Sequence, residues 1–110
     1  MPVAVREKVR ALSKDLGGQA KLARMLGVSP SRVSRWLRTE DPDPENRRKV
    51  EGVEYVLSRL LSLYERDTAL KWLQGFNAHI GNRRPIDLLG QGRVEEVLDA
   101  IRAEEGLSYA

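Results

Sequence analysis

The chain has 110 residues, a formal net charge of +3, one histidine and no cysteine. Its length suits one small domain, or two very small helical units that share a core, and is short for an enzyme. The lack of cysteine excludes disulfides and thiolate metal sites, and one histidine cannot form a histidine cluster. No apolar run could span a membrane and residues 1–16 lack an apolar signal core, so we expect a cytoplasmic protein without membrane contact.

A first helix is predicted over residues 3–16. Apolar residues recur there at intervals of four, three and four positions, which places them on one helical face: Val5, Val9, Leu12 and Leu16. Gly17 and Gly18 follow, and we expect them to end the helix and permit a sharp turn.

Two short helices joined by a glycine turn are predicted next. The first covers residues 19–26, and Gly27 follows it where the chain needs a left-handed stop. Ser29 is placed to cap the second helix, whose first position is Pro30. Helical spacing buries three residues of this second helix: Val33, Trp36 and Leu37. The same spacing leaves a polar and basic outer face: Ser31, Arg32, Ser34, Arg35 and Arg38.

This pair of helices resembles the helix-turn-helix of bacterial and phage repressors. Gln19 opens the unit, Ala23 is the small residue where the helices cross, and Gly27 makes the turn. The resemblance implies that the second helix reads DNA, with Ser34 and Arg35 at base edges. We predict eight DNA-binding residues: Gln19, Lys21, Ser29, Ser31, Arg32, Ser34, Arg35 and Arg38. The alternative is two packed helices whose arginines are only solvated.

The charge is distributed unevenly along the chain. Residues 1–39 contain nine basic residues against two acids, a net charge of +7, whereas residues 40–110 contain ten against fourteen, a net charge of −4. A positive surface raises the affinity for any nucleic acid by releasing counterions, without selecting a sequence. The basic part therefore supports DNA binding, and the acidic part suggests a protein partner or only solubility.

Residues 39–46 contain two prolines and four acids, which predicts a linker with strong turn propensity. Three of the acids alternate as calcium ligands do: Asp41, Asp43 and Glu45. Because Pro42 and Pro44 fix the backbone and the ligands are too few, we interpret these acids as linker and helix-start charges and predict no metal site.

The longest helix is predicted over residues 44–64. Its apolar stripe is wider than one neighbouring helix requires, which suits packing on a second subunit and equally an intramolecular core. Arg47, Arg48 and Lys49 lie in its first turns, where the helix dipole disfavours cations, so phosphate contact could explain their presence.

The chain after this helix is less regular. Asp67 is predicted to cap a short helix over residues 68–74, which Gly75 ends, and we expect Trp72 and Phe76 in the core.

Beyond Phe76, glycine, asparagine and arginine predict a shaped loop over residues 76–92, in which Pro85 starts one helical turn through Leu89. A last helix is predicted over residues 93–104, followed by a loose tail over residues 106–110. The last helix has four inward-facing residues: Val94, Val97, Leu98 and Ile101.

The C-terminal part resembles the toxin-binding domain of the Xre, MbcA and ParS antitoxin family, over roughly residues 50–105. The family pattern begins with a tryptophan-leucine pair and continues through a turn that starts at an asparagine and ends in two basic residues and a proline. Its counterparts here are Trp72, Leu73, Asn77, Arg83, Arg84 and Pro85. Two residues depart from the pattern: Ala78 replaces a frequent proline and Asn82 a frequent second glycine. Asparagine tolerates a left-handed backbone, so we expect the turn to survive.

The resemblance implies an antitoxin of a two-gene toxin-antitoxin pair. It implies a partner toxin of the RES fold that consumes NAD or transfers ADP-ribose from it, so that NAD belongs to the toxin and this chain has no cofactor or catalytic residue. It also implies repression of the chain's own operon through operator DNA, a homodimer, and a higher hetero-oligomer with toxin.

Eight residues are predicted to bind the toxin: Asn77, Arg83, Arg84, Glu95, Glu96, Asp99, Leu107 and Tyr109. The acidic last helix could pair with basic groups that hold pyrophosphate in the toxin, and Leu107 and Tyr109 could plug its pocket. The alternative is a solvated helix face and a frayed end. Arg83 and Arg84 could clamp the turn instead of contacting toxin.

These features predict an all-α protein with an Xre/Cro-like helix-turn-helix bundle followed by a small helical toxin-binding domain. We expect the DNA-binding unit at residues 1–40, the linker and dimerisation helix at 41–66, and the toxin-binding domain at 67–110. The alternative function is a stand-alone dimeric helix-turn-helix repressor. A small hydrolase or nuclease built on His79 and Asp87 lacks a phosphate loop, a metal cluster and a nucleophile-base spacing.

Overall fold

The structure is a computed structural model, and it describes residues 4–108. Over this range the chain forms α-helices and one 3-10 helix, so the all-α fold class is confirmed. The elements, in chain order, are α1 (Val5–Asp15), α2 (Gln19–Leu26), α3 (Pro30–Arg38), α4 (Pro44–Leu61), α5 (Arg66–Gln74), η1 (Ala78–Ile80), α6 (Pro85–Gly90) and α7 (Val94–Ser108).

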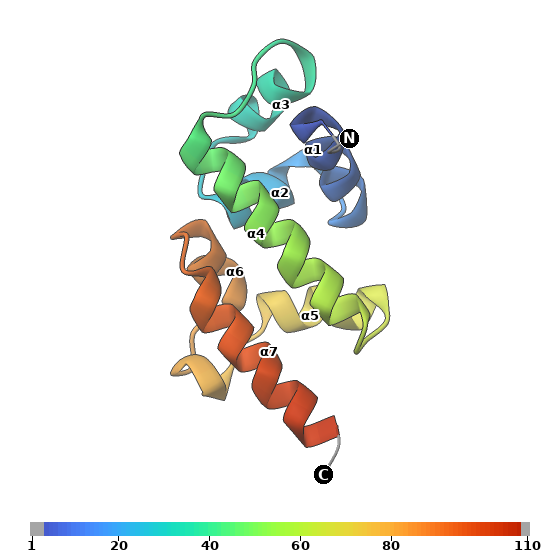
Figure 1. Ribbon diagram of the computed structural model, residues 1–110, viewed down its shortest axis with the longest axis vertical. Coiled ribbons are helices and arrows are strands. Elements are labelled where there is room, and N and C mark those ends of the chain that lie inside the picture. Colours follow the sequence, from blue (N-terminus) through green and yellow to red (C-terminus); the bar gives the residue numbers. More distant parts are fainter. Residues whose placement is uncertain (1–3, 109–110) are drawn as a thin grey trace.

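The long helix α4 runs diagonally through the molecule and connects its two ends (Figure 1). Helices α1, α2 and α3 pack at one end, and α5, α6 and α7 pack at the other. One buried apolar cluster contains residues from both ends and from α4. No helix within residues 4–108 is long and apolar enough to cross a membrane.

The two ends of the molecule also touch directly, where α2 packs on α6. Gly27, at the end of α2, adopts a left-handed conformation with φ of 69°. A Cβ atom placed on Gly27 would lie 2.2 Å from the carbonyl oxygen of Gly90. Arg24 and Asp87 form an ion pair of 3.4 Å across the same boundary. The glycine therefore makes the turn and also permits backbone-to-backbone packing between the two ends.

Local signals placed the helix-turn-helix correctly. Helix α2 covers the predicted residues, and α3 starts at Pro30 after its cap Ser29. Val33 and Trp36 are buried as expected, whereas Leu37 is only half-buried.

Several predictions about the C-terminal half were wrong. Helix α5 starts at Arg66 with Glu65 as its cap residue, so Asp67 lies inside the first turn rather than at the cap. The first hydrogen bond of this helix runs from the amide of Ala69 to the carbonyl of Glu65 at 2.9 Å, which makes Glu65 its cap residue.

The side chain of Phe76 is 70% exposed rather than in the core, and that of Trp72 is half-buried. Phe76 follows Gly75, which has an extended backbone, and its ring lies 4.6 Å from the guanidinium of Arg84. Phe76 thus contacts a cation at the surface and is not part of the buried apolar cluster.

Helix α7 continues to Ser108, so residues 106–108 of the expected loose tail are helical. Glu104 and Glu105 anchor its last turns, because they bind Tyr64 and Arg59 respectively. The predicted toxin-binding residue Tyr109 lies outside the described residues.

Candidate functional sites

The first candidate site is the outer face of α3. Val33 and Trp36 fix the rotation of this helix by packing inward. Arg6 of α1 donates from Nε to the carbonyl oxygen of Trp36 at 3.1 Å. Four predicted DNA-binding residues are exposed as a result: Ser31, Arg32, Arg35 and Arg38. Ser34, which we placed at a base edge, is half-buried.

The other predicted DNA-binding residues lie nearer the turn. Gln19 and Lys21 are exposed at the start of α2. Ser29 Oγ accepts a hydrogen bond from the backbone amide of Arg32 at 3.3 Å, so this side chain begins α3. The structure thus presents α3 and the start of α2 to solvent, and DNA contact by these residues stays a prediction.

Two arginines on α3 form ion pairs with the segment that follows the helix. Arg32 lies 3.7 Å from Asp43, and Arg35 lies 3.4 Å from Glu40. Within residues 4–108, Arg38 and Lys21 form no ion pair. These contacts were not among the predictions, although a basic helix followed directly by an acidic linker is a charge pattern that could have indicated them.

The second candidate site is the turn over residues 77–85, which begins at the buried residue Asn77. Asn77 Oδ1 accepts from the amide of His79 at 2.9 Å, and the Asn77 carbonyl accepts from the amide of Asn82 at 2.9 Å. Asn82 has a left-handed φ of 56°, which confirms that asparagine can replace glycine here. The Asn77 side chain therefore shapes the turn, and its contact with a partner stays a prediction.

Arg83 binds within the domain. Its Nε donates to the carbonyl of Ile80 at 2.7 Å, and its terminal nitrogen lies 2.8 Å from Glu96. Arg93 also donates to Glu96. These two arginines hold the pKa of the Glu96 carboxyl below its ordinary value, mainly through their hydrogen bonds.

Arg84 is half-buried and stacks on Phe76, with its guanidinium 4.6 Å from the ring centroid. Arg83 thus makes contacts that fit the clamp interpretation, whereas Arg84 contacts Phe76 just before the turn, and toxin contact by either arginine stays a prediction.

Of the predicted toxin-binding residues on α7, Glu96 and Asp99 form ion pairs within the chain, whereas Glu95 and Leu107 are exposed. Asp99 pairs with Arg102, as Glu96 does with Arg83 and Arg93. Glu95 forms no ion pair within the described residues and is exposed, and the Leu107 side chain is 64% exposed.

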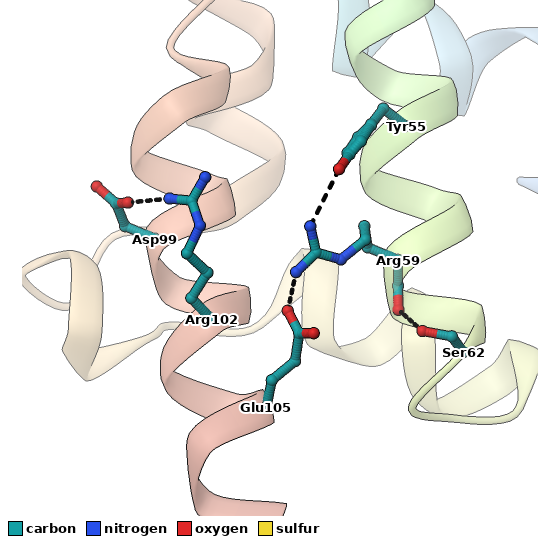
Figure 2. A network of polar contacts seen from close by, with 6 residues as sticks. All are labelled: Tyr55, Arg59, Ser62, Asp99, Arg102 and Glu105. Atoms are coloured by element: carbon teal, nitrogen blue, oxygen red, sulfur yellow. Dashed lines mark hydrogen bonds and ion pairs between the residues drawn. The ribbon is translucent and has the colours of Figure 1, made fainter.

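Polar contacts attach the end of α7 to α4 (Figure 2). Glu105 accepts a hydrogen bond from Arg59, which also donates to the Tyr55 hydroxyl at 3.1 Å. The hydrogen bonds to Tyr55 and Glu105 raise the pKa of Arg59. Tyr64 donates to Glu104 at 2.8 Å, and burial followed by this hydrogen bond raises the pKa of Tyr64. The last turns of α7 therefore belong to the folded body up to Glu105.

A groove of about 480 Å³ lies between α5, the turn and α7. Its lining includes aromatic and charged side chains: Tyr64, Lys71, Trp72, Phe76, His79 and Glu104. No pattern in the sequence indicated this groove, because Phe76, which lines it, was expected in the core. No group of histidine, cysteine, aspartate or glutamate within residues 4–108 could hold a metal ion.

Comparison with known proteins finds relatives for most of the chain. No family model matches it. The mycobacterial cidal antitoxin MbcA of Mycobacterium tuberculosis, like that of Mycobacterium bovis, is 30% identical over 80 residues, which are 72% of this chain and 71% of the relative. The crystal structure of the M. tuberculosis MbcT-MbcA toxin-antitoxin complex contains a chain that matches with a TM-score of 0.75 and 26% identity, over 93% of this chain and 94% of that chain.

Proposed function

The chain belongs to the family of MbcA antitoxins, and from this premise we propose that it neutralises a RES-fold toxin and represses its own operon. One observation carries the proposal: the structural match extends over both ends of the chain, and the matched chain comes from a toxin-antitoxin complex. On this proposal the toxin, not this chain, consumes NAD or transfers ADP-ribose from it. The chain forms a homodimer and a larger complex with toxin.

The surface of α3 supports the DNA-binding part of this proposal. Its buried residues leave Arg32, Arg35 and Arg38 exposed on one short helix. The proposed mode places α3 in the major groove, with Arg35 and Ser34 at base edges and Gln19 and Lys21 at phosphates. A dimer would then read a palindrome whose half-sites lie about one helical turn apart.

Replacing Arg35 with alanine tests this mode. Because a guanine-reading arginine contributes about 1–3 kcal/mol of discrimination, Arg35→Ala should lose preference for the operator while retaining most binding to random DNA. Fluorescence anisotropy with both duplexes at one salt concentration measures the two affinities. Arg10→Ala, at an exposed position of α1 outside the predicted set, is the matched control and should retain the preference. Equal losses on both duplexes for Arg35→Ala would contradict base reading.

The C-terminus supports the neutralising part of the proposal. The C-terminal end of α7 projects from the rest of the molecule (Figure 1). Leu107, which follows the anchored Glu105, is exposed. A segment laid across the mouth of an NAD pocket inhibits by occupancy and needs no catalysis of its own. The acids of α7 supply charge opposite to the groups that would otherwise hold pyrophosphate.

A chain ending after Glu105 tests this plug. The cut removes Leu107 and Tyr109 but keeps Glu104 and Glu105, which anchor α7 to the body. On this proposal the adjacent gene encodes the toxin, and its expression stops growth. Co-expression of the full chain should restore growth, and co-expression of the shortened chain should not. Co-purification reports binding separately. Full neutralisation by the shortened chain would contradict the plug, and failure of the full chain to capture a toxin would favour a stand-alone repressor.

A further inference from the structure

We propose that the acidic linker after α3 competes with DNA for the arginines of the DNA-binding unit. This inference rests on the proposed DNA binding. Three acids within four positions, which we call the linker acids, are Glu40, Asp41 and Asp43. Each pairs with a different arginine of the N-terminal unit: Glu40 with Arg35 at 3.4 Å, Asp41 with Arg6 at 3.8 Å, and Asp43 with Arg32 at 3.7 Å.

The two pairs on α3 lie on the surface that the proposed DNA complex would use. The side chains of Arg32 and Arg35 are 45% and 44% exposed to solvent. The carboxylates therefore neutralise these guanidinium groups without burying them. Exposed pairs of this kind are weak, whereas phosphates and guanine edges accept bidentate hydrogen bonds from arginine. DNA can therefore displace the carboxylates.

The displaced acids cannot move far from the DNA. The amide of Glu40 donates to the carbonyl of Arg35 at 3.0 Å, which holds the linker to the end of α3. Asp43 is the N-cap residue of α4 and accepts a hydrogen bond from Asn46 at 2.5 Å. Pro42, between the two, is buried. Each DNA complex thus keeps two carboxylates near the phosphates, which repel them.

The consequence is a lower affinity for every DNA sequence. An arginine already paired with a carboxylate releases fewer counterions when it meets a phosphate, so its contribution to non-specific binding falls. A single copy then binds DNA weakly, and stable repression requires two or more copies joined by oligomerisation. The linker acids in this way make occupancy of the promoter depend on assembly.

The test neutralises the two acids that face α3 in the full chain. Glu40→Gln and Asp43→Asn preserve side-chain size, and asparagine remains a good helix cap. The matched control, Glu65→Gln with Asp67→Asn, makes the same two chemical changes at the start of α5, where neither acid forms an ion pair within residues 4–108. Thermal melting checks that both double variants fold. Fluorescence anisotropy then measures binding to the promoter duplex and to a random duplex of equal length, over a range of salt concentrations.

The linker variant should bind both duplexes about two- to fivefold more tightly per freed arginine at low salt, and the gain should shrink at high salt. Its plot of log affinity against log salt should steepen by about 0.9 for each additional phosphate contact. Equal gains in the linker variant and the control, or no gain in either, would overturn the inference while leaving the proposed DNA binding intact. If no protein, variants included, binds either duplex, the proposed DNA binding fails and the inference fails with it.

Discussion

Two arginines at opposite ends of the molecule, Arg32 and Arg83, make different kinds of contact. Arg32 on α3 and Arg83 in the turn have similarly exposed side chains, at 45% and 42%. However, Arg83 donates to the carbonyl of Ile80 within its own turn, whereas the Arg32 side chain, among residues 4–108, contacts a carboxylate at 3.7 Å and the ring of Trp36 at 5.8 Å but no backbone carbonyl. Exposure alone therefore does not distinguish an arginine available to a partner from one that holds the fold together.

The difference follows from what surrounds each arginine. Arg32 and Arg35 form exposed side-chain pairs from α3, and neither pair completes a backbone hydrogen bond. Arg83, by contrast, donates to a backbone carbonyl of the turn over residues 77–85 and helps to complete that turn. We expect Arg32 and Arg35 on α3 to matter chiefly for binding, and Arg83 to matter also for stability.

The largest expected effect concerns the contact that joins the two ends. Gly27→Ala would place a Cβ atom 2.2 Å from the carbonyl oxygen of Gly90 and would force alanine into a left-handed backbone. We expect a loss of about 3 kcal/mol in the free energy of unfolding, measured by urea denaturation. Gly106→Ala is the control, because a Cβ atom there meets nothing within 4 Å. A loss below about 1 kcal/mol for Gly27→Ala would mean that the close contact between Gly27 and Gly90 can relax at little cost.

The elements that could be predicted from the sequence are those fixed by neighbours in the chain. The last residue of α2 and the first residue of α3 were predicted correctly, because the residues between and at these positions have their own conformational preferences: Gly27, Ser29 and Pro30. Asn82 likewise has an intrinsic tolerance for the left-handed region.

The features that could not be predicted depend on distant partners. Phe76 lies outside the core beside Arg84, and the last turns of α7 are held to the rest of the chain by Arg59 and Tyr64 through its glutamates. No spacing in the sequence reports these contacts. For the same reason the periodic pattern could assign residues to the outer face of α3 but could not show that the linker acids lie beside it.

A direct comparison of the two kinds of arginine should give a smaller effect. Arg83→Gln removes the donor to the Ile80 carbonyl and the pair with Glu96, and we expect a loss of about 1 kcal/mol in the free energy of unfolding. Arg35→Gln removes only an exposed pair and should cost less than about 0.5 kcal/mol. Urea denaturation of both variants measures the difference. Equal losses would show that the two arginines do not differ in structural role.

The smallest effect should appear as a dependence of stability on pH. Arg83 and Arg93 lower the pKa of Glu96 in the folded chain, so its carboxylate contributes stability above the ordinary glutamate value of 4.5. That contribution is lost as the pH falls from there through the lowered pKa. Glu96→Gln should therefore be less stable than the wild type at neutral pH, and the two should converge in acid. Glu65 forms no ion pair within the described residues, so the difference in stability between Glu65→Gln and the wild type should not change with pH. A constant gap between Glu96→Gln and the wild type at every pH would show that charge at Glu96 does not hold the turn to α7, and the contrast with α3 would then rest on the hydrogen bond to Ile80 alone.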